Sequence, residues 1–158
     1  MIILKLNKKE TNLLNDLKAS EELCIEKYER YSKQAKDKDL KGLFDAIGAE
    51  ESQHLDTING ILSGKMPDMS SGNSPDDKNF KVPKKVCYGK ECSSADKQHD
   101  AYLCTDALST EKHVSSSYNT DIFEFTNKQI RDALNHIQKE EQEHGKQIYD
   151  YMDANGMY

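Results

Sequence analysis

The chain has 158 residues, of which 35% are hydrophobic and 8% aromatic, and it contains no Trp. This length fits one domain with a single core, and the low aromatic content favours a helical bundle over a β-sandwich. The formal net charge is −6, and Lys is mixed evenly with Asp and Glu, so no basic stripe stands out. Nucleic acid and anionic membrane surfaces are therefore not expected as partners.

The N-terminal segment Met1–Lys9 contains a short apolar run that Lys5 interrupts. It lacks both the length of a signal peptide and a small-residue cleavage site. No part of the chain approaches the ~18 consecutive apolar residues of a membrane-spanning helix. We expect a soluble protein without a secretory signal, located in the cytoplasm.

A first helical hairpin is predicted over 10–64, because side chains of one stripe recur there at alternating steps of three and four. The polar turn 37–39 separates its two helices, and Asp39 is expected to cap the second. The two inward stripes are Leu14, Leu17, Glu21, Cys24, Tyr28, Tyr31 and Ala35, then Leu40, Phe44, Ile47, Glu51, His54, Ile58 and Ile61. Both stripes should be apolar throughout, yet Glu and His interrupt them.

Segment 65–95 is rich in Ser, Gly, Asp, Lys and Pro and shows no sustained period. Such a long connection is uncommon inside a compact domain. It is needed where the second and third helices run parallel, because the chain must then travel the full length of the bundle. We therefore predict a long crossover linker here.

Four cysteines are present, and none belongs to a paired Cys-x-x-Cys motif, which excludes a zinc ribbon or a rubredoxin-type iron site. Cys24 and Cys104 lie on inward stripes and are expected to be buried thiols. Cys87 and Cys92 lie in the linker, as free thiols, a redox pair or cross-linking points. A reducing compartment favours free thiols.

A second hairpin is predicted over 96–155, with Asn155-Gly156 as the stop of its last helix. Its inward stripes are Cys104, Ala107, Glu111, Val114, Tyr118, Asp121 and Phe125, then Ile130, Leu134, Ile137, Glu141, His144, Ile148 and Tyr151. At an offset of ninety residues the two hairpins share identities that fall mostly on inward positions. We interpret them as two copies of one hairpin, forming an all-α four-helix bundle in a single domain over 1–158.

The polar residues on the stripes recur at this offset and are called here the six ligand candidates. They are Glu21, Glu51, His54, Glu111, Glu141 and His144. Glu-x-x-His places a carboxylate and an imidazole one turn apart on one helix face, and two such pairs with two lone Glu residues form the ligand set of dinuclear carboxylate bundles. Burying four carboxylates without cations would cost several kcal/mol for each carboxylate, whereas two divalent cations would cancel the four negative charges.

The predicted roles follow from the spacing. Glu51 and Glu141 are expected to bridge the two ions, and each ion receives one lone Glu and one His as terminal ligands. Carboxylate and imidazole ligands without thiolate suit iron or manganese, and zinc could occupy the site in vitro. Tyr28 and Tyr118 lie one heptad after the lone Glu residues, and their phenols either hydrogen-bond a ligand carboxylate or merely pack.

Other acidic and imidazole groups near the motif lie off the stripes, and we expect them to be ordinary surface groups. They are Glu50, Glu140, Glu143, His99, His113 and His136.

Two family resemblances emerge from these residues. Segments 10–60 and 100–154 resemble the ferritin-like superfamily, notably the erythrin domain of rubrerythrins, in which Tyr follows a lone Glu by seven residues and Glu-x-x-His follows it by about thirty. Segments Leu108–Tyr118 and Leu134–His144, with the ending Tyr151–Tyr158, are similar to the coat F family of spore coat proteins.

The resemblances imply a left-handed bundle with one long crossover and assign ligand roles to the six candidates. No rubredoxin-like module follows, and Val114 stands where rubrerythrins have a further Glu. The leading hypothesis is a dinuclear iron or manganese protein of the forming spore or its coat that acts on peroxide or oxygen. The alternative is a structural coat or interaction protein in which the metal pair only stabilises the bundle, with other coat proteins or further copies of the chain as partners. Iron storage in a hollow shell is less favoured.

Overall fold

The protein folds, in a computed structural model that describes residues 4–69, 88 and 92–158, into four long helices. These are α1 (Lys8–Gln34), α2 (Lys38–Leu62), α3 (Ser94–Ile122) and α4 (Lys128–Ala154). The described residues contain no strand, and their one isolated β-bridge joins Tyr88 to Cys92. The all-α prediction is confirmed. No helix among these residues combines the length and apolar character needed to cross a membrane.

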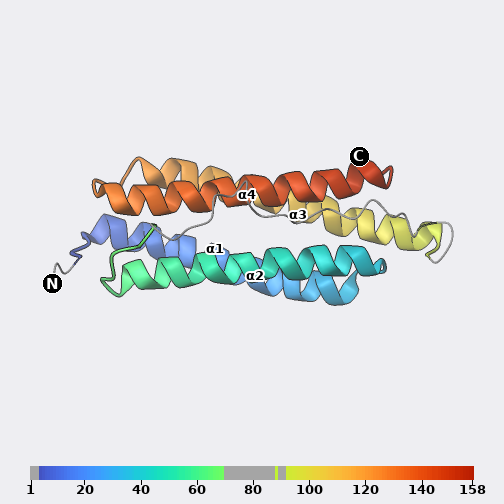
Figure 1. The fold of residues 1–158 in the computed structure, drawn as a ribbon, viewed down its shortest axis with the longest axis horizontal. Coiled ribbons are helices and arrows are strands. Elements are labelled where there is room, and N and C mark those ends of the chain that lie inside the picture. The colour runs from blue at the N-terminus through green and yellow to red at the C-terminus, as the bar shows by residue number, and fades with distance from the viewer. Residues whose placement is uncertain (1–3, 70–87, 89–91) are drawn as a thin grey trace.

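The helices lie side by side as two antiparallel hairpins, α1 with α2 and α3 with α4 (Figure 1). The hairpins contact each other mainly through α2 against α4 and α1 against α3. α2 ends at one end of the molecule and α3 begins at the other, so these two helices run parallel (Figure 1). Most of the connection between them lies outside the described residues, and the crossover linker stays a prediction.

The core is built from the four predicted inward stripes. All of their residues are buried except Tyr31 and Asp121, which are half-buried. Leu, Ile, Phe and Tyr from all four helices join one cluster, and each fully buried aliphatic side chain contributes about 1.5–3 kcal/mol to folding. The stripes therefore hold the hairpins together and point the ligand candidates inward.

Capping residues define the helix ends. Asn7 and Glu10 form a reciprocal capping box at the start of α1, with hydrogen bonds of 2.8 and 3.0 Å. The expected cap at Asp39 is wrong, because α2 begins one residue after Asp37. The Asp37 carboxylate accepts a hydrogen bond from the Tyr151 hydroxyl and none from the backbone of α2. The predicted stop of α4 is confirmed, with Gly156 at φ +64°.

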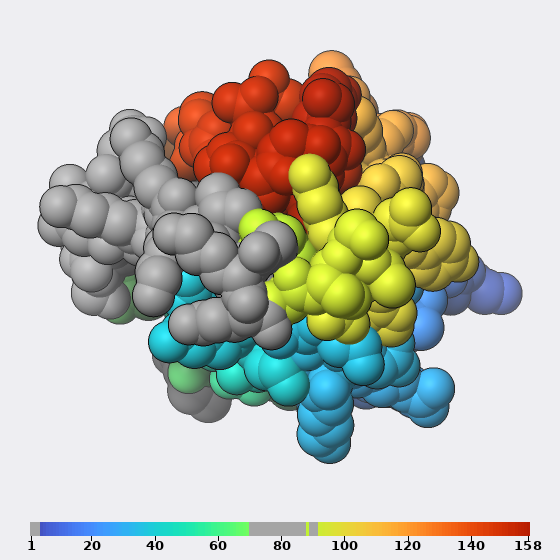
Figure 2. Space-filling model, turned by 90° about the vertical axis from the view of Figure 1, so that its right-hand side faces the viewer, coloured from blue at the N-terminus to red at the C-terminus, as the bar shows by residue number. Residues whose placement is uncertain are grey.

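A buried carboxylate fastens the end of the molecule where α2 and α3 begin. Asp100 on α3 is fully buried and accepts hydrogen bonds from the backbone N–H groups of Lys36 and Asp37 at 2.8 and 2.9 Å. It also accepts from the Tyr88 hydroxyl, at 2.5 Å. Figure 2 looks onto this end and shows the yellow-green start of α3 between the cyan start of α2 and the red end of α4. Asp100 thus ties the α1–α2 turn to the second hairpin.

The cysteines follow the prediction in part. Cys24 and Cys104 are free and buried, as expected. Cys92 is disulfide-bonded, so the expected free thiol at this position is wrong. That expectation depended on an assumed reducing compartment, which residue spacing does not determine. Cys87 lies outside the described residues.

Candidate metal centre

The fold brings all six ligand candidates to one level of the bundle. α1 and α3 contribute one Glu each, and α2 and α4 contribute one Glu and one His each. Every one of these side chains is at most 2% exposed. They form two overlapping groups, in each of which one ligand atom per residue lies within 4.8 Å of the others. Glu51 and Glu141 belong to both groups.

The two shared carboxylates each face both imidazoles. Glu51 Oε2 lies 3.1 Å from Nδ1 of His54, and Glu51 Oε1 lies 3.3 Å from Nδ1 of His144. Glu141 Oε1 lies 3.2 Å from Nδ1 of His54, and Glu141 Oε2 lies 3.7 Å from Nδ1 of His144. One oxygen for each side is the arrangement that a carboxylate bridging two ions requires.

The other two carboxylates each serve one side. Glu21 Oε1 lies 3.8 Å from His54 Nδ1, and Glu111 Oε2 lies 3.5 Å from His144 Nδ1. The two imidazole rings stack with their centroids 5.7 Å apart. The geometry therefore offers two similar ligand sets, each with one unshared Glu and one His.

Unsatisfied polar atoms gather at this centre. Among the described residues, eight buried side-chain nitrogen or oxygen atoms have no hydrogen-bond partner, and seven of the eight belong to the ligand candidates. Leaving a buried charged group unpaired costs more than about 1–3 kcal/mol. Oxygen and imidazole nitrogen are donors that iron, manganese and zinc accept. The residues present thus fit two divalent cations, which would supply partners for the carboxylate oxygens and for His144 Nδ1.

The pKa values of the ligand candidates also favour bound cations. Burial, together with the Glu51 and Glu141 carboxylates, raises the pKa of Glu21 to about 9. Burial also raises the pKa of Glu111 well above its usual value. Burial alone would lower the pKa of His54, but the surrounding carboxylates raise it well above its usual value, and the same holds for His144. Without cations the centre therefore takes up protons.

Two tyrosines hold the unshared carboxylates. The Tyr28 hydroxyl on α1 donates to Glu111 Oε1 on α3, and the Tyr118 hydroxyl on α3 donates to Glu21 Oε1 on α1. Both rings are fully buried. Of the two roles left open by the sequence, the structure therefore shows the hydrogen-bonding one. Each tyrosine orients a carboxylate of the other hairpin.

Two flanking glutamates were expected to be surface groups, and the structure corrects this. Glu140 is only 5% exposed, and its Oε1 lies 3.7 Å from Nε2 of His54. Glu50 is half-buried, and its Oε2 lies 2.8 Å from Nε2 of His144. Each therefore approaches the outer nitrogen of a His in the opposite hairpin. Glu50 and Glu140 are equivalent positions at the ninety-residue offset, and this repetition is the sequence signal that could have indicated their shared role.

The remaining flanking residues behave mostly as predicted. His99, His113 and Glu143 are exposed. His136 differs, because it is half-buried and its Nε2 lies 2.6 Å from Glu140 Oε1. It extends the contacts of Glu140 outward to the surface.

Comparison with known protein families gives a match for part of the chain. Residues 99–158 match the Coat F domain. The predicted coat F resemblance is thereby confirmed for these residues, which include most of α3 and all of α4. The Coat F match contains Glu111, Tyr118, Glu141 and His144, which is half of the centre with its tyrosine. Neither a search of curated proteins nor one of solved structures gave a match. Membership of the ferritin-like superfamily stays a prediction.

Proposed function

We propose that the protein is a spore coat protein whose helical bundle is braced by two divalent metal ions, iron or manganese, bound by the six ligand candidates. The coat assignment is supported by the Coat F match over residues 99–158. The bracing role is supported by one observation above all, the seven buried atoms of the centre that lack a hydrogen-bond partner.

The bracing role has a simple physical basis. Each group of ligand atoms includes residues from both hairpins, since Glu51 on α2 and Glu141 on α4 belong to both. Ions bound there would link the hairpins through the middle of the core. They would also neutralise carboxylates whose burial costs several kcal/mol for each unpaired charge. Metal binding and folding stability should therefore be coupled.

Metal content and thermal stability test this proposal together. Protein expressed with iron or manganese should retain two ions per chain by elemental analysis and should melt at a lower temperature after chelation. Glu141→Ala should lose metal, whereas the control Glu143→Ala, which changes an exposed residue two positions away, should retain it. A folded wild-type protein that takes up neither metal would refute the bracing role.

A second candidate function is redox chemistry on peroxide or oxygen at the same centre. The observation that favours it is a surface groove whose lining includes Glu111 and Glu141. Bound iron or manganese would supply the redox chemistry, while the carboxylates and imidazoles hold the ions and the apolar core excludes bulk water. Peroxide consumption by metal-loaded protein with a reductant, lost in Glu51→Ala, would support this function. Intact metal without turnover would leave the bracing role alone.

The coat assignment has its own test. Tagged protein produced from its own promoter in the native spore-forming host should appear in coat extracts of purified spores. Its absence from the coat, with the protein present in the sporulating cell, would contradict the assignment.

A further inference from the structure

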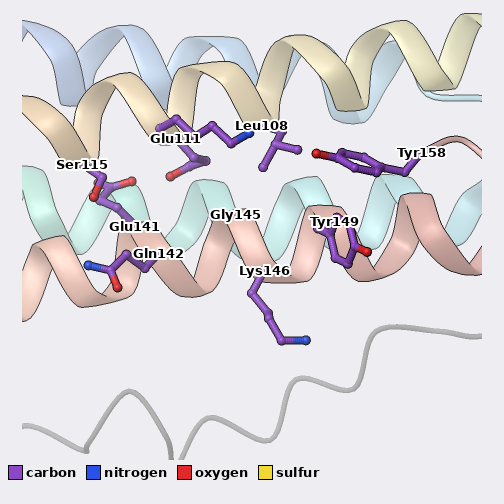
Figure 3. Close-up of a pocket in the computed structure, with 10 residues that line it drawn as sticks. Leu108, Glu111, Ser115, Glu141, Gln142, Gly145, Lys146, Tyr149 and Tyr158 are labelled. Carbon is purple, nitrogen blue, oxygen red and sulfur yellow. The ribbon is translucent and has the colours of Figure 1, made fainter.

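A groove of about 510 Å³ runs along the surface between α3 and α4 (Figure 3). Its lining includes Leu108, Tyr149 and Tyr158, and it also includes Glu111 and Glu141. Both glutamates are ligand candidates and are at most 2% exposed. The groove therefore ends against two residues of the centre, whose carboxylate oxygens lie buried behind it.

Gly145 keeps this groove open. It lies inside α4, directly after His144, and its φ is not positive. A Cβ at this position would lie 3.6 Å from Leu108 Cδ1 and 3.9 Å from Glu111 Cβ, which are ordinary contacts. Neither the backbone nor the packing requires glycine, which costs about 1 kcal/mol relative to Ala inside a helix. A longer side chain would extend into the space beside Glu111.

The other hairpin carries a larger side chain at the equivalent place. Ninety residues earlier the position after His54 is Leu55, a half-buried side chain on α2. The two hairpins agree in their ligand candidates and differ in the residue that follows each His. Gly in the second copy leaves space beside Glu111 that a side chain of the size of Leu55 would reduce.

The charges beside the groove also differ between the copies. Lys112 and Lys146 line the groove, whereas the equivalent positions of the first hairpin are Glu22 and Asp56. Lys146 forms an ion pair with Asp150 at 2.6 Å. Positive side chains at a mouth raise the local concentration of anions and disfavour cations. The groove thus carries two lysines, of which Lys146 is paired with Asp150, where the first hairpin carries two acidic residues.

We propose that the groove is the entry and binding site through which a small anionic or neutral molecule with a donor oxygen or nitrogen atom reaches the metal pair. The ligand would approach beside Gly145 and arrive next to Glu111 and Glu141. The proposal rests on the proposed metal binding and extends it from a closed bracing centre to one with an open side. A purely closed centre would need no such opening.

Azide binding to the iron-loaded, oxidised protein tests the proposal, because azide bound to ferric iron gives a charge-transfer absorption band. Gly145→Leu, which copies Leu55, should retain both irons, and its azide association rate should fall by about tenfold, equivalent to roughly 1.4 kcal/mol on the barrier. The control Gly42→Leu also places Leu at a helical glycine, at an exposed site with nothing within 4 Å. It should bind azide as the wild type does.

A second variant tests the charges without filling the groove. The double variant Lys112→Glu and Lys146→Glu should retain both irons and slow azide association by about tenfold at low salt. Wild-type azide kinetics in iron-loaded Gly145→Leu would overturn the proposal, and so would unchanged kinetics in the charge variant. Failure of wild-type protein to retain iron is a different result, because it refutes metal binding itself.

Discussion

The hydroxyl of Tyr28 on α1 donates a hydrogen bond to the buried carboxylate of Glu111 on α3. The reciprocal bond runs from Tyr118 on α3 to Glu21 on α1. Each hairpin therefore orients the unshared carboxylate of the other. This exchange joins the packing of the two hairpins to the geometry of the centre, so changes in one should appear in the other.

Tyr28→Phe tests this coupling. The change leaves a buried carboxylate oxygen without its donor, so the free energy of unfolding of metal-free protein should fall by about 1–3 kcal/mol. Metal affinity should fall by about 10- to 100-fold, because Glu111 loses the group that orients it. Urea unfolding and competitive metal titration measure the two effects. Tyr102→Phe, at a ring that is 72% exposed, is the control and should change neither.

Glu50→Gln tests the partner of the outer nitrogen of His144. The Glu50 carboxylate lies 2.8 Å from Nε2, and a carboxylate there orients the imidazole and makes it a stronger donor to a metal. The amide should reduce metal affinity by about 10- to 100-fold while the helical circular dichroism stays unchanged. Equal affinity in Glu50→Gln and in the exposed control Glu143→Gln would show that Glu50 is only a surface group.

The metal-free protein should lose stability as the pH rises. Burial raises the pKa of Glu21 from its ordinary value of 4.5 to about 9, so between these two pH values only the folded state keeps this proton. The contribution of Glu21 to the free energy of unfolding is full below about pH 4.5 and is lost as the pH rises to about 9. His54 and His144 act in the same direction above about pH 6.5, because their folded pKa values are also raised.

Glu51 has the opposite effect on the pH dependence of stability, and this effect is confined to acidic pH. The His residues hold the pKa of Glu51 well below its usual value despite burial, so its contribution is lost as the pH falls through that lower value. Melting temperatures from about pH 6 to about pH 9 should therefore fall in chelator, and they should fall less in manganese, which replaces the protons. A flat profile in chelator would contradict the proton uptake.

Asp100→Ala should weaken the fold without changing the ligands. Two backbone N–H groups and the Tyr88 hydroxyl lose their acceptor, at about 1–3 kcal/mol for each group that stays buried and unpaired. Urea unfolding should show the loss, while the number of metal ions per chain should remain that of the wild type. A loss of metal from the folded variant would show instead that this end of the bundle is coupled to the metal centre.

The inward stripes and the convergence of the ligand candidates could be predicted from sequence, because period and spacing determine which side chains face the core and at what depth. The roles of Glu140 and Asp37 could not. Glu140 lies off the stripe of its own helix and is buried by contact with the opposite hairpin. Asp37 is held by Tyr151, which is more than one hundred residues away in the chain. Such contacts depend on how the hairpins dock, which the period of one helix does not encode.

Gly145 illustrates a different limit. Its presence beside His144 is visible in the sequence, but its meaning depends on Leu108 and Glu111 of α3 lying across from it. The repeat supplies the comparison with Leu55, and the structure supplies the groove. Neither observation alone identifies an open side.

Anomalous diffraction at the iron or manganese absorption edge, from crystals of metal-loaded protein, would locate the proposed ions in the bundle. Two peaks about 3.5–4 Å apart are expected, with Glu51 and Glu141 each contacting both. Well-ordered density for the six ligand candidates with no anomalous peak among them would contradict the proposed metal binding.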